Sequence, residues 1–153
     1  GREVVYIGAR NGSRPLGLAF NVGMRLPAHL AATGKAMLAF RDPADVRALF
    51  DGSELAALTD RRAPSLDELL DELAAIRTRG YSIDDEGVRA GVYCFGAPVF
   101  DASGQPVAGV GVCIHKSALG HDGSAAHRDA VQRAAATLTQ RLGGRLPHAS
   151  RSA

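Results

Sequence analysis

The spacing of apolar residues changes several times along the chain, and each change predicts a new element. Glu3–Arg10 is rich in Val, Ile and Tyr, and Asn11-Gly12 after it is a strong turn signal. Leu16–Asn21 is then expected to return as the second strand of a hairpin. Ala31–Phe40 switches to Ala, Leu, Met and Lys, which favour helix. The first forty residues therefore predict a hairpin followed by a helix.

Two further helices have clear start signals. Asp42-Pro43 places an N-cap and a first-turn proline before a helix that runs to about Phe50. Ser65–Glu68 fits a capping box, in which the Ser oxygen and the Glu carboxylate each satisfy a backbone amide. Gly80 is a suitable stop for this second helix. Its apolar face follows helical spacing: Leu66, Leu69, Leu70, Leu73 and Ile76.

The second half of the chain returns to strand-like patterns. Tyr81–Ile83, Val92–Phe100 and Pro106–His115 are strand candidates, and a last helix is expected to begin near Ser124. The inner stripe of that helix is expected to be Val131, Ala134, Ala135, Leu138 and Leu142. Strands, helices, strands and a helix in this order predict an α+β domain with an antiparallel sheet and helices packed on it.

The turn at 101–105 fixes the register of the last two strands. If the turn is centred between Ser103 and Gly104, residues equally far from that point face each other across the strands. Directly opposed side chains share one face of a sheet. We therefore expect these pairs to be opposed: Phe100 with Val107, Ala97 with Val110, and Cys94 with Cys113.

The two cysteines are the main chemical candidates on this hairpin. The favoured interpretation is that both are small buried hydrophobic residues that line a core or a pocket. A soft-metal site with Asp84 or a His is an alternative, although no Cys-x-x-Cys spacing supports it. A redox-active or nucleophilic thiol is the third, since His115 shares the face of Cys113 in a regular strand.

Thr33-Gly34-Lys35 resembles part of a phosphate-binding loop. That motif needs an earlier glycine and a later Ser or Thr, and this chain has His29 and Ala36 at those positions. A phosphate loop is therefore rejected. Two interpretations remain for 31–34: free amides at a helix start that attract anions, or small residues that allow close packing on the sheet.

Asp84, Asp85 and Glu86 form an acidic run after a short strand. The default interpretation is a solvated turn. Alternatively, one of the three faces a pocket and accepts a hydrogen bond from a ligand. The residues alone do not choose which one.

Length and composition narrow the class of protein. The 153 residues suit one domain, with 46% hydrophobic and 22% charged residues as in ordinary globular proteins. A formal charge of +2 and scattered aromatic residues argue against a nucleic-acid surface. Two cysteines favour a reducing compartment, and neither a membrane-spanning run nor a signal peptide is expected. The abrupt start suggests a domain cut from a longer chain.

From Val4 to about Leu142, the chain resembles the effector-binding domain of the isocitrate-lyase-regulator (IclR) family of bacterial transcription factors. The resemblance rests on Leu26–Phe40, on Arg77–Val112 and on the closing amphipathic helix. Its most specific pieces are Pro27-x-His29 with Gly34-Lys35-Ala36, Gly80-Tyr81 with Asp84-Asp85-Glu86, and Gly91-Val92 with Ala97-Pro98-Val99-Phe100-Asp101.

The resemblance implies a GAF/PAS-like curved antiparallel sheet flanked by helices, with an effector pocket on its concave face. It implies an effector-binding domain, here taken as residues 1–143, and a winged helix-turn-helix domain before this chain that would contact DNA. A disordered tail over 144–153 is expected from the polar and basic residues after Gly143-Gly144. The resemblance further implies a cytoplasmic homodimer or homotetramer that binds a small organic acid or aromatic effector, without a cofactor or metal and away from membranes.

Carried over position by position, the resemblance implies a pocket lined by Leu18, Leu26, Ala32, Thr33, Gly34, Asp84, Val92, Cys94, Gly111 and Cys113. Amides of 32–34 would hold an effector carboxylate, and Asp84 would accept from a hydroxyl. Many members end the last strand with Ser-x-Ser-Gly, where this chain has Gly111-Val112-Cys113-Ile114. Because two hydroxyl donors are missing and Gly111 should open room, a larger or more apolar effector is expected.

We therefore expect a ligand-binding regulatory domain rather than an enzyme. One alternative is a stand-alone GAF-like small-molecule sensor. Another is an enzyme with Cys94 or Cys113 as nucleophile and His115 as base.

Overall fold

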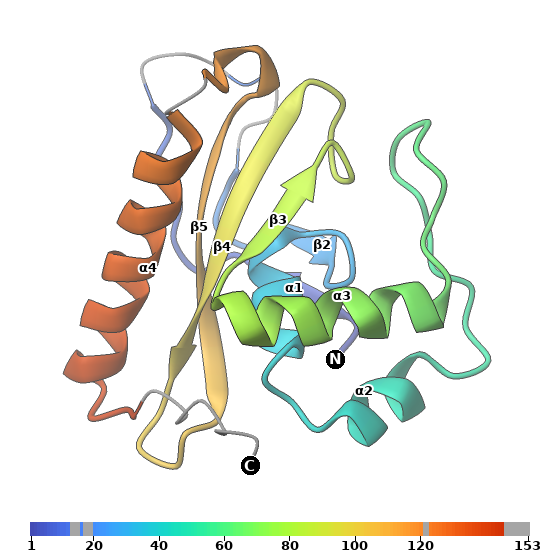
Figure 1. The fold of residues 1–153 in the computed structure, drawn as a ribbon, viewed down its shortest axis with the longest axis horizontal. Helices are drawn as coiled ribbons and strands as arrows, with labels where there is room; N and C mark the ends of the chain where they lie inside the picture. The colour runs from blue at the N-terminus through green and yellow to red at the C-terminus, as the bar shows by residue number, and fades with distance from the viewer. Residues whose placement is uncertain (13–15, 17–19, 121–122, 146–153) are drawn as a thin grey trace.

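A three-stranded antiparallel sheet lies at the centre of the structure, a computed structural model that describes residues 1–12, 16, 20–120 and 123–145. The strands are β3 (Ser82–Asp85), β4 (Val92–Phe100) and β5 (Pro106–His115), in that spatial order. Figure 1 shows them as one twisted sheet with helices on both sides. The expected α+β class with antiparallel strands is confirmed.

The register of β4 and β5 confirms the predicted pairs over most of the hairpin. Cys94 faces Cys113 and Ala97 faces Val110, but Phe100 faces Pro106 rather than Val107. The difference arises in the turn, where the Asp101 carboxylate accepts hydrogen bonds from backbone amides of the turn, including that of Ser103 at 2.9 Å. The turn is therefore one residue tighter than expected, and a register shift between Val99 and Phe100 absorbs the difference.

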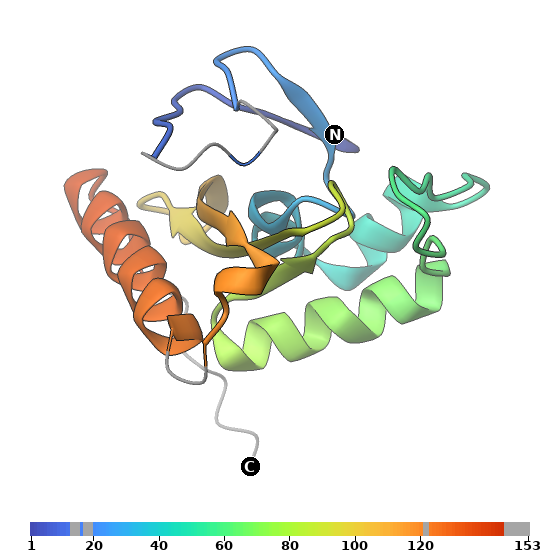
Figure 2. The same ribbon diagram turned by 90° about the horizontal axis from the view of Figure 1, so that it is seen from above.

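Successive residues of the strands face opposite helices. On one face, the short helix α1 (Ala32–Leu38) packs against all three strands, and the Ser82 hydroxyl donates to the carbonyl of Ala32 at 2.5 Å. On the other face lies α4 (Gly123–Arg141), whose Val131 packs with Phe95. Figure 2 shows the sheet between these two helices. The sheet is thus covered on both sides.

Helices α2 (Pro43–Phe50) and α3 (Leu66–Arg79) begin where their caps predict. The Asp42 carboxylate accepts from the Ala44 amide, and the capping box of Ser65 and Glu68 is complete. Gly80 ends α3 with a φ of 79°. Together with α1 these helices enclose an apolar core: Ala28, Leu38, Ala39, Val46, Phe50, Leu55, Leu69, Leu73 and Ile76.

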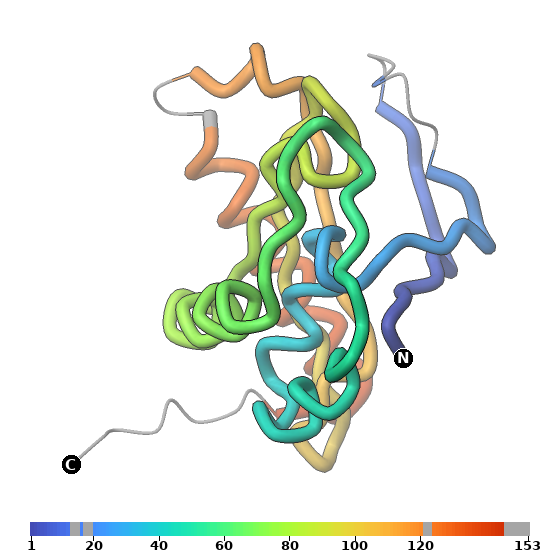
Figure 3. The backbone as a smooth tube through the Cα atoms, turned by 90° about the vertical axis from the view of Figure 1, so that its right-hand side faces the viewer, coloured from blue at the N-terminus to red at the C-terminus, as the bar shows by residue number. Residues whose placement is uncertain are grey.

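The N-terminal hairpin differs from the prediction. The short strand β1 (Glu3–Val5) pairs with β2 (Arg25–Pro27), and Val4 faces Leu26. The expected partner strand, Leu16–Asn21, is not a strand at its described residues, and 17–19 lie outside the described residues. The pairing continues past β1 because the Tyr6 amide donates to the carbonyl of Met24 at 2.9 Å. The part of the chain before β2, described at residues 1–12, 16 and 20–24, is called the N-terminal segment below. It lies along the α1 side of the domain (Figure 3).

The buried stripe of α4 also differs from the prediction. Val131 and Ala135 are buried, but Ala134, Leu138 and Leu142 are exposed. The stripe continues instead through Thr139, whose hydroxyl accepts the Phe100 amide at 3.1 Å. A polar residue is buried here because it satisfies a strand amide that has no partner in the ladder.

The end of the chain falls mostly outside the described residues. Of the expected tail over 144–153, only Gly144 and Arg145 are described. Their amides donate to the carbonyls of Thr139 and Asp101. A short 3₁₀ turn, η1 (Lys116–Ala118), follows β5.

Candidate functional site

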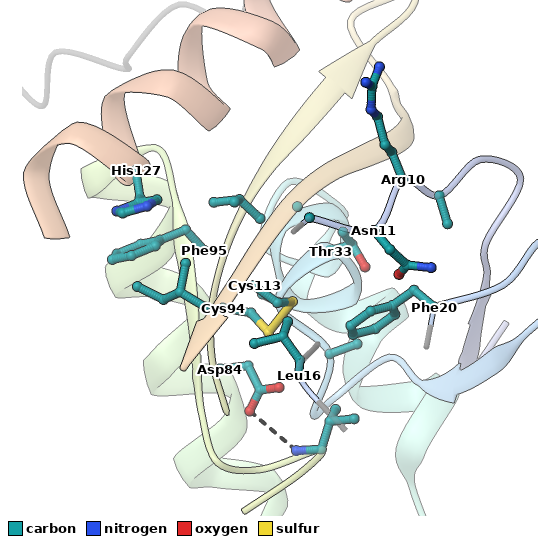
Figure 4. Close-up of a pocket in the computed structure, with 18 of the residues that line it drawn as sticks. Arg10, Asn11, Leu16, Phe20, Thr33, Asp84, Cys94, Phe95, Cys113 and His127 are labelled. Atoms are coloured by element: carbon teal, nitrogen blue, oxygen red, sulfur yellow. Dashed lines mark hydrogen bonds between the residues drawn. A yellow bond between two sulfur atoms is a disulfide. The ribbon is translucent and has the colours of Figure 1, made fainter. Parts of the chain in front are cut away.

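A cavity of about 1380 Å³ lies between the α1 face of the sheet and the N-terminal segment. It continues around β5 to residues on the α4 side, such as Phe95 and His127, so the space over the α1 face is only part of this volume (Figure 4). Its lining combines a majority of apolar residues with polar and charged ones, as in many small-molecule sites. The lining residues described below include Tyr6, Leu16, Phe20, Leu26, Ala32, Thr33, Asp84, Cys94, Gly111 and Cys113.

The floor of the cavity carries a disulfide between Cys94 and Cys113. Both cysteines line the cavity, in keeping with the favoured interpretation, and the prediction that they share a face of the sheet is confirmed. None of the three interpretations included a bond between them, and in that respect the prediction was wrong. Their Cα atoms are 4.1 Å apart, in keeping with the closer type of opposed pair in antiparallel strands. The bond removes both thiols as metal ligands or nucleophiles in this state, and His115 has no thiol to activate.

Asp84 is the acidic residue that faces the cavity. It is the third residue of β3 and is only 3% exposed, with its Oδ1 atom held by the Gly87 amide at 2.7 Å and the Val88 amide at 3.3 Å. Burial raises the pKa of this carboxyl, against the lowering effects of these amides and of Lys35. Since the turn amides occupy Oδ1, a ligand donor would approach Oδ2 (Figure 4).

The other two acidic residues form ion pairs away from the cavity. Asp85 and Glu86 both bind Lys116 at 2.7 Å, and Glu86 binds Arg61 at 2.8 Å. Hydrogen bonds from these cations and from the Gly91 amide lower the pKa of Glu86 to about 2. The expected solvated turn is thus wrong for Asp84 and Asp85, which belong to β3, and only Glu86 lies in the turn.

The start of α1 forms one wall of the cavity. Its N-cap residue, Ala31, has no side-chain oxygen to cap the helix. Among the described residues, the amides of Ala32, Thr33 and Gly34 have no hydrogen-bond acceptor. Carboxylate binding at these amides stays a prediction.

Close packing of small residues is evident in the same segment. A Cβ atom on Gly34 would lie 2.4 Å from the carbonyl oxygen of Ala28, so Gly34 faces the helix–loop contact and does not line the cavity. A Cβ atom on Gly111 would lie 2.9 Å from the Thr33 methyl carbon. Gly111 lines the cavity, but its small size admits Thr33 rather than opening room for a ligand.

Lys35 does not reach the cavity. Its ammonium group is buried behind α1 and donates to Glu72 of α3 at 2.7 Å. This pairing agrees with the rejection of a phosphate loop, since the lysine holds two helices together.

Aromatic side chains from the N-terminal segment cover the cavity. The rings of Tyr6 and Phe20 are 5.2 Å apart, and the Tyr6 hydroxyl lies 3.5 Å from the Thr33 hydroxyl. Burial raises the pKa of Tyr6. Arg10 and Asn11 lie further along the same wall (Figure 4).

The structure brings most of the predicted site residues together. Seven line the cavity: Leu26, Ala32, Thr33, Asp84, Cys94, Gly111 and Cys113. Gly34 does not, and Val92 is buried beside Ala32 and Cys94 without lining it. Leu18 lies outside the described residues.

Sequence reasoning missed Tyr6, Leu16 and Phe20. All three stood on the two predicted N-terminal strands, which were expected to form a hairpin. The alternation of side chains along the predicted strand would have placed Tyr6 on one face of the hairpin. The neighbouring residues did not indicate that this face covers the central sheet.

In the described part of the chain, no group of three or more His, Cys, Asp or Glu side chains is placed to hold a metal ion. None of the described helices has the length and apolar character of a membrane span.

Comparison with known proteins places this geometry in a family. Residues 1–140 match the family model for the bacterial transcriptional regulator IclR C-terminal domain. The HTH-type transcriptional regulator XynR of Escherichia coli K12 is 31% identical over 143 residues, which cover 94% of this chain and 57% of XynR. The chain spans about half the length of the curated relatives it matches.

Solved structures agree with the fold. The crystal structure of the Agobacterium tumefaciens repressor BlcR aligns with a TM-score of 0.85 and 41% identity, over 95% of this chain and 57% of that one. Thermotoga maritima IclR aligns with a TM-score of 0.87 and 30% identity, over 94% of this chain and 58% of that one. The chain belongs to the IclR family of bacterial transcriptional regulators and corresponds to their C-terminal, effector-binding domain.

Proposed function

We propose that the cavity between the N-terminal segment and the β4–β5 hairpin is the effector pocket of this regulator. The observation that carries the proposal is the position of Asp84. The Oδ1 atom of Asp84 is held by two turn amides, which makes this carboxylate a fixed acceptor at the cavity. Most of the other lining residues are apolar or aromatic, which favours a ligand with a largely apolar body.

The proposed effector is a small organic acid or aromatic compound with a hydroxyl or another donor for Asp84. Tyr6 and Phe20 offer aromatic surfaces to a ring, and the disulfide offers an apolar floor. At the two positions of β5 where many family members carry serines, this chain has Gly111 and Cys113. Because neither offers a hydroxyl, a ligand with few polar groups suits this part of the cavity. The ligand is proposed to be bound and not converted, because the relatives are transcriptional regulators. In this state the disulfide also leaves neither cysteine as a free nucleophile.

In the full-length protein, we propose that effector binding shifts a homodimer or homotetramer between arrangements and thereby controls DNA binding by a separate N-terminal domain. Since that DNA lies in the bacterial cytoplasm, we propose the same location for the protein. XynR, one of the relatives, is an HTH-type transcriptional regulator, which supports this proposal.

A thermal-shift screen of aliphatic and aromatic carboxylic acids, with and without hydroxyl groups, tests the pocket. A ligand at a hundred times its Kd stabilises the folded state by about 2.7 kcal/mol, or roughly 5–10 °C in Tm for a domain of this size. Asp84→Asn keeps an oxygen for Gly87 and Val88 but presents an NH₂ donor to the ligand, so it should abolish the shift for hydroxylated compounds.

Asp67→Asn is the matched control, because Asp67 lies on the surface of α3 with a side chain 79% exposed. It should keep the full thermal shift. An unchanged shift in Asp84→Asn would show that the compound binds elsewhere.

A further inference from the structure

The Cys94–Cys113 disulfide lies in the floor of the cavity of a transcriptional regulator. Such a regulator is proposed to act in the cytoplasm, which keeps most thiols reduced. Disulfides in that compartment are usually transient, with catalytic or redox-sensing roles. We propose that this disulfide is a thiol-exchange site, reached by a small thiol of the glutathione class through the cavity. The role of the exchange in regulation rests on the proposed function of the cavity.

Access to the disulfide is limited to the α1 side of the sheet, which faces the main part of the cavity. The opposite face of β4 carries Phe95, which packs against Val131 of α4. Cys94 is only 4% exposed, whereas Cys113 is partly exposed. Leu16 packs against the cluster that contains Cys94, and Figure 4 shows it beside the two sulfur atoms. An attacking thiol must therefore enter the cavity, pass Leu16 and reach the Cys113 sulfur.

The chemistry is a two-step exchange that balances without any other reagent. A thiolate attacks Cys113 Sγ, a mixed disulfide forms, and the Cys94 sulfur leaves as a thiolate that takes up a proton. A second thiolate attacks the sulfur of the incoming thiol in the mixed disulfide, and Cys113 leaves and is protonated. The protein disulfide gains two electrons, and two thiol molecules are oxidised to one disulfide.

Reduction changes the wall that a ligand touches. Two unbonded sulfur atoms need more room than two bonded ones, and Ala32 and Val92 already pack against Cys94. The added volume must therefore extend toward Leu16 and the cavity. A ligand that occupies the cavity must also block the approach of a thiol, so occupancy and exchange oppose each other.

The test follows reduction of the native protein by glutathione, with quenching by iodoacetamide and measurement of the intact mass. We expect reduction of wild type without loss of its circular dichroism. Leu16→Ala, which uncovers the disulfide, should speed reduction by more than about fivefold. Tyr6→Ala opens the same side and is the second variant. Ile7→Ala is the matched control, since Ile7 is 84% exposed beside Tyr6, and it should reduce at the wild-type rate.

Three results would overturn the proposal: reduction only in denaturant, reduction by thioredoxin but not by glutathione, or equal rates in wild type and both opening variants. No ligand is needed for these measurements, so a thermal-shift screen without hits leaves them valid. Conversely, any compound that stabilises wild type but not Asp84→Asn must slow the exchange by at least about fivefold. A bound compound with no effect on the rate would separate the exchange site from the effector pocket.

Discussion

Thr33 of α1 fits against Gly111 of β5 so closely that a Cβ atom on residue 111 would lie 2.9 Å from the Thr33 methyl carbon. Ordinary carbon contacts are about 3.5–4.0 Å long, so no side chain fits between the helix and this strand. The contact sets the distance between two walls of the cavity.

Gly111→Ala is therefore expected to lower the free energy of unfolding by about 1–3 kcal/mol, because the added methyl forces α1 from β5. Thr33→Ser removes the opposing methyl and should restore most of the loss in the double variant. Urea denaturation of the four proteins measures the coupling. Gly8→Ala, where a Cβ would meet nothing within 4 Å, is the control. Additive losses in the double variant would contradict the contact.

The disulfide is expected to stabilise the domain by about 3 kcal/mol, as chain-entropy treatments give for a closed loop of roughly this length. Urea denaturation of wild type with and without a strong reductant measures this difference. A Cys94→Ala/Cys113→Ala variant should show no response to the reductant. Equal stability of oxidised and reduced wild type would contradict the prediction.

Asp84 is expected to make the domain less stable as the pH rises. Because burial raises its pKa in the folded state, the unfolded chain loses its proton first, from about its ordinary value of 3.8 upward. The loss of stability accumulates between that value and the higher pKa of the folded state, and it remains in full above both. Asp84→Asn should remove this loss, so its stability relative to wild type should be greater at pH 7 than at pH 3. Parallel pH profiles of the two proteins would contradict the prediction.

Thr139→Val is expected to cost about 1–3 kcal/mol, because the buried Phe100 amide loses its acceptor. Thr139→Ser keeps the hydroxyl and should recover most of that stability. Thr137→Val, in the same helix but exposed, is the matched control. Thermal unfolding ranks the three, and a neutral Thr139→Val would show that the amide finds another partner.

Features that depend on neighbours in sequence could be predicted from the residues. The capping box of Ser65 and Glu68 needs only four residues, and the register of Cys94 with Cys113 follows from one turn. The face shared by the cysteines and the cavity followed from this register. The part of the candidate site that lies on the β4–β5 hairpin and on α1 could therefore be predicted from the sequence.

Features that depend on distant partners could not be predicted in this way. The partner of β1 is Arg25–Pro27, which is too short to show a strand pattern and contains proline. Thr139 interrupts an apolar stripe because its partner is a strand amide 39 residues away. Opposed cysteines indicate that a bond is geometrically open to them, but the spacing in the sequence does not reveal whether it forms.

Cys94 and Phe95 are neighbours in β4, and their side chains lie on opposite faces of the sheet. That of Cys94 lies on the α1 face in the disulfide, and that of Phe95 packs against Val131 of α4. One peptide unit of β4 therefore connects the cavity to α4. If a bound ligand shifts this strand as a rigid body, both side chains move together, and the packing of α4 on the sheet changes. Leu138 and Leu142 of that region are 42% and 57% exposed, so the shift would also move apolar side chains on the molecular surface.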